Sequence, residues 1–328
     1  MIIAEIGSVH DGSLGNAKKL VDIAKDSGAS FVKFQMHFAE EETLKDAINP
    51  DYFKDEKRFE YFKRTSFSIN QWKSLIVHSK RKKIEFMCSV FSLKAFEVLL
   101  KLKVKNIKIP SGELTNLPLL IKINKKKDLN IFLSTGMSSW REINGALKEL
   151  SNHKVILMQC SSIYPCPETL VGLNVIKEMK SKFGNRCEYG FSDHTIGSEA
   201  AICSVVYGAK YIEKHITFSK KMYGSDAKFA MEPNQFKYFC NSIKKAKKIL
   251  SSKVDKNNLK KYIKMKNIFE KRVIAKRDLN KGDKIKFSDL NFKKSNKGIK
   301  VFDYKKILGK VLKRKIFKNQ SIKSEFLK

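Results

Sequence analysis

The feature that most constrains this chain is a repeated alternation of short apolar runs and amphipathic stretches. Eight runs rich in β-branched and aromatic residues predict strands, at residues 2–7, 31–36, 84–90, 107–110, 131–135, 155–160, 188–192 and 211–216. Between them apolar residues recur every three or four positions, as in INQWKSLIVHSKRK, which predicts helices. Eight such units predict a (β/α)₈ barrel, with a doubly wound open sheet as the alternative.

The end of the chain has a different pattern. Short, near-alternating runs and turn signals such as NKGD and FKNQ predict a small β-rich domain. A polar, lysine-rich stretch precedes it. We therefore predict a catalytic barrel at residues 1–252, a linker at 253–268 and a β-rich domain at 269–328.

Composition narrows the classes of function. Lys and Arg number 67 against 33 Asp and Glu, which raises the possibility of nucleic-acid binding. The lysines are spread over many helices, so we interpret them as a solvated surface and expect no nucleic-acid partner. No apolar run is long enough to cross a bilayer, so no membrane partner is expected. Six scattered cysteines without a CxxC pair predict reduced thiols and a cytoplasmic location.

Polar residues follow nearly every predicted strand. In a barrel of this kind the site forms at the carboxyl ends of the strands, so these positions carry the most information. The candidates are His10, Asp11, Lys33, Gln35, His37, Ser89, Lys108, Ser111, Glu113, Ser134, Thr135, Ser161, Ser162, Tyr164, Ser192, Asp193, His194, Glu213, Lys214 and His215.

Two lysines inside strands, Lys33 and Lys108, point to an anion. Alternate residues of a barrel strand face the lumen, where a lysine needs a negative partner. Hydroxyl and backbone N–H groups at PSG and STG supply the hydrogen bonds that a phosphate requires. Together these groups predict a small phosphate-bearing ligand.

His194 and His215 end the last two strands, 21 residues apart, and should lie side by side at the rim. Paired imidazoles beside carboxylates suit Mn²⁺, Co²⁺ or Zn²⁺. Two alternatives remain open: histidines packed under loops, or a general base with the group that orients it.

In order along the chain, AEIGSVHDGS, VKFQ, IPSGE, LSTGM, CSSIYP, GFSDHT, IEKHIT and GSD resemble the sialic acid (N-acetylneuraminate) synthase family. The C-terminal LNKGDKIKFSDL and ILGKV resemble its antifreeze-like SAF domain. The resemblance spans essentially the whole chain. It implies a TIM barrel with a SAF domain, a domain-swapped homodimer, and condensation of phosphoenolpyruvate with N-acetylmannosamine or a related N-acyl hexose to give a nonulosonic acid and phosphate.

The resemblance also implies roles for individual residues. His194 and His215 match ligands of a divalent metal, most often Mn²⁺, with Mg²⁺ or Co²⁺ as alternatives. The positions that match a phosphoenolpyruvate site are Lys33, Ser89, Lys108, Ser111, Ser134, Ser162 and Ser192. Those that match sugar contacts are Asp11, Gln35, Tyr164, Asp226 and Lys294. Asp11, Glu113, His194 and His215 match the catalytic set.

Four positions differ from the usual family pattern. Members of the family often have Asn at the positions of Val9 and Ser162, Glu or Asn at the position of Asp11, and Arg at the position of Lys294. Lysine keeps the charge of arginine but loses its two-pronged hydrogen bonding. Legionaminic or pseudaminic acid synthesis in the same family is therefore an alternative. A Schiff-base aldolase using Lys33 or Lys108 is another, and a basic binding module for nucleic acid or acidic glycan is a third.

Overall fold

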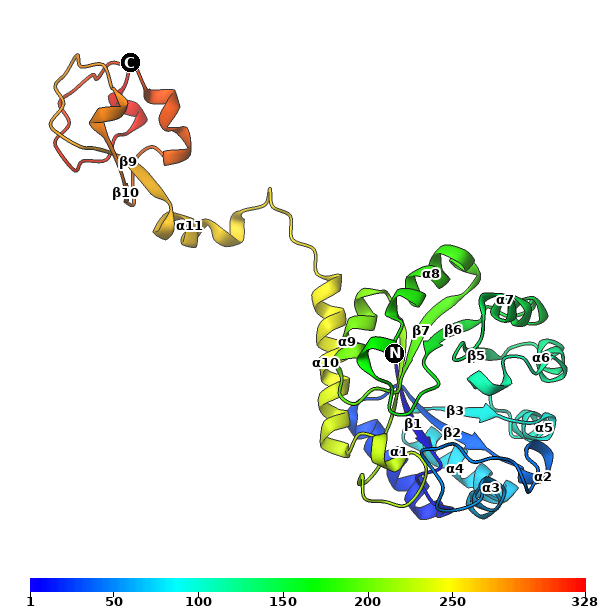
Figure 1. Ribbon diagram of the computed structural model, residues 1–328. Helices are drawn as coiled ribbons and strands as arrows, with labels where there is room; N and C mark the ends of the chain where they lie inside the picture. The colour runs from blue at the N-terminus through cyan, green and yellow to red at the C-terminus, as the bar shows by residue number, and fades with distance from the viewer. The chain divides into compact units, whose positions relative to one another are not determined.

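The computed structural model describes residues 1–328 and divides them into two compact units, Met1–Ser252 and Lys253–Lys328. The first is a closed barrel of eight parallel strands with helices around it (Figure 1). The strands are β1 (Ile2–Gly7), β2 (Phe31–Met36), β3 (Glu85–Val90), β4 (Asn106–Ile109), β5 (Asn130–Ser134), β6 (Ile156–Cys160), β7 (Glu188–Asp193) and β8 (Tyr211–His215). Because β1 pairs in parallel with both β2 and β8, the barrel closes and the open-sheet alternative is wrong.

Helices follow the strands and cover the barrel. They are α1 (Leu14–Ser27), α2 (Ala39–Glu42), α3 (Arg58–Thr65), α4 (Ile69–Arg81), α5 (Leu93–Lys101), α6 (Leu117–Asn124), α7 (Trp140–Glu149), α8 (Leu173–Phe183), α9 (Glu199–Val206) and α10 (Pro233–Ser251). Serine caps fix several starts: Ser68 and Ser139 each form a capping box with the residue three positions later. The short helices α2 and α3 were not expected; they lie in the long connection after β2.

The barrel interior is divided into an apolar lower part and a polar upper part. A cluster of buried side chains fills the lower part: Ile3, Phe31, Met87, Phe132, Ile156, Met158 and Tyr211. Residues two positions further along the same strands face the same lumen, because side chains alternate along a strand. Glu5, Lys33 and Glu213 occupy such positions and are buried. Polar groups therefore gather at the carboxyl end, above an apolar base.

The second unit, Lys253–Lys328, has its own core. It contains α11 (Ile263–Phe269) and a two-stranded antiparallel sheet of β9 (Lys271–Ala275) and β10 (Leu290–Lys294), extended by isolated bridges and 3₁₀ turns. The predicted linker stretch is partly helical and belongs to this unit. All six cysteines are unpaired. None of the helices combines the length and apolar character that a membrane crossing would need.

Candidate active site

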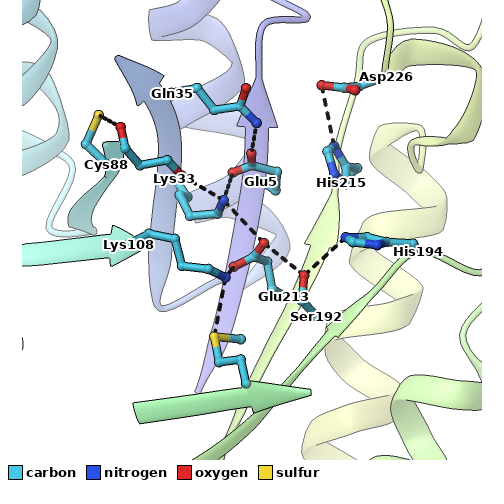
Figure 2. Close-up of polar contacts among 12 residues, drawn as sticks. Glu5, Lys33, Gln35, Cys88, Lys108, Ser192, His194, Glu213, His215 and Asp226 are labelled. Carbon is cyan, nitrogen blue, oxygen red and sulfur yellow. Dashed lines mark hydrogen bonds and ion pairs between the residues drawn. The ribbon is translucent and has the colours of Figure 1, made fainter. Parts of the chain in front are cut away.

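Four charged side chains from four strands meet at the carboxyl end of the barrel (Figure 2). Lys33 Nζ lies 3.0 Å from Glu5 Oε2 and 3.3 Å from Glu213 Oε1. Lys108 Nζ lies 2.7 Å from Glu213 Oε2. Strand register explains the first pair, because Glu5 and Lys33 are partners on β1 and β2. The two lysines predicted to bind an anion are thus already balanced by two buried carboxylates.

Burial and pairing decide the ionisation of this cluster. Burial alone would lower the pKa of Lys33, but Glu213 and Glu5 raise it well above its ordinary value. Burial alone would raise the pKa of Glu213, but Lys108 and Lys33 outweigh that effect and hold it far below its ordinary value. Lys33 also donates to Ser89 Oγ at 3.2 Å, so its three N–H groups are engaged. An ammonium held in this way is a poor Schiff-base nucleophile.

Serine hydroxyls and two imidazoles complete the cavity above this cluster. Its volume is about 70 Å³. The lining residues are Glu5, Lys33, Gln35, Ser89, Lys108, Pro110, Ser111, Ser134, Cys160, Tyr164, Ser192, His194, Glu213 and His215. Ser192 connects its two halves, because its Oγ donates to Glu213 at 3.0 Å and lies 3.3 Å from His194 Nε2. Eleven of the candidate residues named from the sequence are therefore brought together.

The strand ends of β4, β5 and β6 meet at Gly136. Ser111 Oγ and Ser162 Oγ lie 3.1 Å apart, and Gly136 approaches both with a φ of +46°. A Cβ atom at this position would lie 2.2 Å from Ser111 Cβ and 2.6 Å from Ser162 Oγ. Only glycine fits both the backbone conformation and the space. Ser162 itself does not line the cavity, but it holds Ser111, which does.

Gly136→Ala is expected to destabilise the barrel by about 1–2 kcal/mol through its left-handed backbone alone. It should also weaken binding of phosphoenolpyruvate, the expected ligand, because Ser111 and Ser162 must move apart. Thermal unfolding and calorimetric titration measure the two effects. Gly145→Ala in α7 is the matched control, since no atom lies near its added Cβ. Unchanged ligand affinity in Gly136→Ala would show that this turn does not shape the ligand site.

His194 and His215 lie side by side, with ring centroids 6.0 Å apart. His194 Nδ1 faces the Ser161 carbonyl oxygen, which only accepts, so Nδ1 carries the proton and the Nε2 lone pair accepts from Tyr164 OH at 2.9 Å on the cavity side. Burial, with the neighbouring His215, lowers the pKa of His194 to about 3, so this imidazole is neutral. His215 Nδ1 is buried without a hydrogen-bond partner, 3.9 Å from Asp226 Oδ2.

These two nitrogens fit a divalent metal ion. Neutral imidazoles are ligands for borderline ions, and an unpartnered buried nitrogen costs free energy unless it finds a partner. No group of three or more His, Cys, Asp or Glu is placed to hold an ion. His194 and His215 are thus the two residues that would hold such an ion, and water or substrate oxygens would have to supply its other positions.

Asp11 and Glu113 lie outside the cavity lining. Asp11 Oδ1 accepts from Arg64 at 2.7 Å, and Arg64 also binds Glu56 at 3.1 Å, which ties the first loop to α3. Glu113 accepts from Asn116 at 2.7 Å, and burial raises the pKa of this carboxyl. Both residues are thus at the rim.

Lys294 belongs to the other unit. It ends β10, and its Nζ lies 5.1 Å from the centre of the Phe269 ring. Glu5 is the functional candidate that the sequence analysis missed, and Glu213 was noted only as a strand-end residue. The signal was present in both cases: a charged residue inside a strand, in phase with the apolar residues of the lower lumen.

Comparisons with known proteins identify the family of this chain. The NeuB family model matches residues 20–255, and the SAF domain model matches residues 271–328. The chain belongs to the NeuB family. This NeuB-family chain is 37% identical over 321 residues to N,N'-diacetyllegionaminic acid synthase of Campylobacter jejuni, covering 95% of each.

Two further relatives are a known synthase and a solved crystal structure. N-acetylneuraminate-9-phosphate synthase of Drosophila melanogaster is 29% identical, over 98% of this NeuB-family chain and 94% of its own length. The crystal structure of an N-acetylneuraminic acid synthetase from Leptospira borgpetersenii, in complex with citrate, superposes with a TM-score of 0.70 at 28% identity. It covers 82% of this chain and 91% of that one. The predicted family, barrel and SAF domain are confirmed.

Proposed function

We propose that this chain condenses phosphoenolpyruvate with an N-acyl hexose to give a nonulosonic acid and phosphate. The observation that carries the proposal is the buried Glu5–Lys33–Glu213–Lys108 cluster, set beside serine hydroxyls and two neutral imidazoles. Such a cavity can share its lysines with a phosphate or carboxylate. Relatives named as synthases of legionaminic and neuraminic acids support the same class of reaction.

In the proposed reaction, C3 of phosphoenolpyruvate forms a bond to the aldehyde carbon of the open-chain sugar, and the aldehyde oxygen becomes a hydroxyl. Water adds at C2, and phosphate leaves with cleavage of the C–O bond, so the atoms balance. We propose that Lys33, Lys108 and the serines orient the phosphate and carboxylate. Glu113, whose pKa burial raises, is the proposed acceptor of the water proton. A Mn²⁺ ion held by His194 and His215 would supply Lewis-acid polarisation of the aldehyde.

Gln35, Tyr164, Asp226, Asp11 and Lys294 are the proposed contacts of the sugar. The acyl sugar we favour is a diacetamido-trideoxy hexose, because the chain covers nearly all of a legionaminic acid synthase at 37% identity. N-acetylmannosamine is the other candidate. A homodimer is also proposed, and sedimentation tests it directly.

Phosphate release should require phosphoenolpyruvate, one N-acyl hexose and Mn²⁺ together, and EDTA should abolish it. A panel of N-acetylmannosamine, its 6-phosphate and diacetamido-trideoxy hexoses identifies the sugar. Borohydride should trap no substrate on Lys33, which is held as a charged ammonium. Burial lowers the pKa of Lys108, so substrate trapped on Lys108 would instead favour the Schiff-base alternative. A folded protein that releases no phosphate with any sugar of the panel would overturn the proposed function.

A further inference from the structure

His37 lies next to the cavity without lining it. It directly follows β2, and its ring is stacked between Phe62, with centroids 3.9 Å apart, and Phe91, with centroids 4.3 Å apart. Its two nitrogens have different partners: Nδ1 lies 2.9 Å from Glu42 Oε1, and Nε2 lies 3.1 Å from Gln35 Oε1. The His37 and Glu42 side chains are only 4% and 5% exposed. Packing and hydrogen bonds together fix the ring.

The protons of this ring follow from its neighbours. Gln35 faces Glu5 at 2.7 Å on its other side. Two acceptor oxygens that close would repel each other, so the amide nitrogen of Gln35 donates to Glu5 and its oxygen faces His37. That oxygen needs a proton on His37 Nε2. Glu42 Oε1 lies 2.9 Å from Nδ1 at the other side of the ring and fixes its orientation.

We propose that His37 is a positioning residue: its buried ring locks the Gln35 amide with its nitrogen toward Glu5 and the cavity. Glu42 at Nδ1 and the stacked rings of Phe62 and Phe91 hold the imidazole in place. The ring thereby connects the loop after β2 to the Glu5–Lys33 pair.

The lock has a consequence for recognition, which rests on the proposed function. Gln35 lines the cavity, and its amide nitrogen has a second N–H beyond the one given to Glu5. Gln35 therefore presents a donor, and the sugar group that meets it must be an acceptor oxygen. If the amide were free to turn, half of its orientations would present the wrong group.

Nitrogen NMR on the full chain labelled with ¹⁵N-histidine tests the protonation directly. The chain has six histidines, and the His37→Gln variant assigns the His37 signals by their loss. His37 Nε2 should appear as N–H. An unprotonated Nε2 would overturn the proposal. This measurement needs no substrate, so it stands even if the proposed reaction fails.

Two near-isosteric variants test the positioning. Glutamine can place an N–H near the Nε2 position and keep the bond to Gln35, whereas asparagine reaches only the Nδ1 position. His37→Asn should therefore raise KM for the N-acyl hexose by about tenfold, the value of one lost buried hydrogen bond. KM for phosphoenolpyruvate should change little. His37→Gln should stay close to the wild type.

His78→Gln is the matched control. His78 also pairs with a carboxylate, Asp22 at 2.8 Å, but lies on α4, outside the cavity lining. It should leave both KM values unchanged. Equal behaviour of His37→Asn and His37→Gln, or equal changes in both KM values, would mean that His37 only supports the fold. Absence of turnover in the wild type would instead remove the proposed function and leave the NMR result to decide the state of His37.

Discussion

Glu213→Gln is expected to destabilise the barrel by about 3–5 kcal/mol and to abolish turnover. Glu213 is the counter-charge of both Lys108 and Lys33, at 2.7 and 3.3 Å, and it accepts from Ser192. Glutamine keeps the shape but leaves Lys108 without a carboxylate partner and Lys33 with Glu5 alone. Urea unfolding followed by circular dichroism measures the loss of stability, and phosphate release measures turnover.

Glu188→Gln provides the comparison. Glu188 also pairs with a lysine, Lys210 at 2.8 Å, but both side chains are partly exposed, so the loss should stay within about 1 kcal/mol. Added phosphate should stabilise Glu213→Gln more than the wild type, because the unpaired lysines then accept an external anion. Equal losses in the two variants, or no added effect of phosphate, would show that the buried cluster is not held by its charges.

The barrel was predictable because two patterns alternate along the chain. Short apolar runs mark the strands, and apolar residues that recur every three or four positions mark the helices between them. The runs at 2–7 and 31–36 match β1 and β2 residue for residue. β4 and β5 begin and end one residue before the predicted runs, and the other four strands differ by one residue at one end. Buried parallel strands are short and almost wholly apolar, so their limits are sharp. The C-terminal unit has only β9 and β10 as strands, because much of its backbone is held by turns and single bridges. The alternating apolar pattern of the C-terminal sequence therefore did not predict how many strands this unit has.

The site was predictable in its members but not in its pairings. The rule that active groups follow barrel strands selected Lys33, Lys108 and His194, and the structure brings them to one cavity. Lys108 and Glu213 are 105 residues apart, and their contact exists only because the barrel closes. The local sequence indicates a buried lysine that requires a negative partner, but it does not indicate which distant carboxylate is that partner. The same holds for Asp11, whose partner Arg64 lies in an unexpected helix.

The largest effect on turnover is expected from His194→Ala and His215→Ala. Each removes one of two proposed imidazole ligands, and losing several kcal/mol of charge stabilisation lowers turnover on the order of a thousandfold. Electron paramagnetic resonance of Mn²⁺ gives a readout independent of activity, and both variants should release the ion. His153→Ala is the control, since its ring contacts only the Ile123 carbonyl outside the cavity.

The stabilities and the Mn²⁺ release of these two variants, measured together, distinguish a metal site from histidines that only pack. His194 is bonded to the Ser161 carbonyl and Tyr164, so its loss leaves buried polar groups unpaired and should cost about 1–3 kcal/mol. His215 Nδ1 has no partner, so its loss costs no such bond. Both interpretations predict these unequal stabilities, but only a metal site predicts an equal loss of Mn²⁺ from the two variants. If either variant retained Mn²⁺, that histidine would not be a ligand, and the ion would be bound by other residues. The unpartnered Nδ1 of His215 would then be a packing feature that lowers stability without serving metal binding.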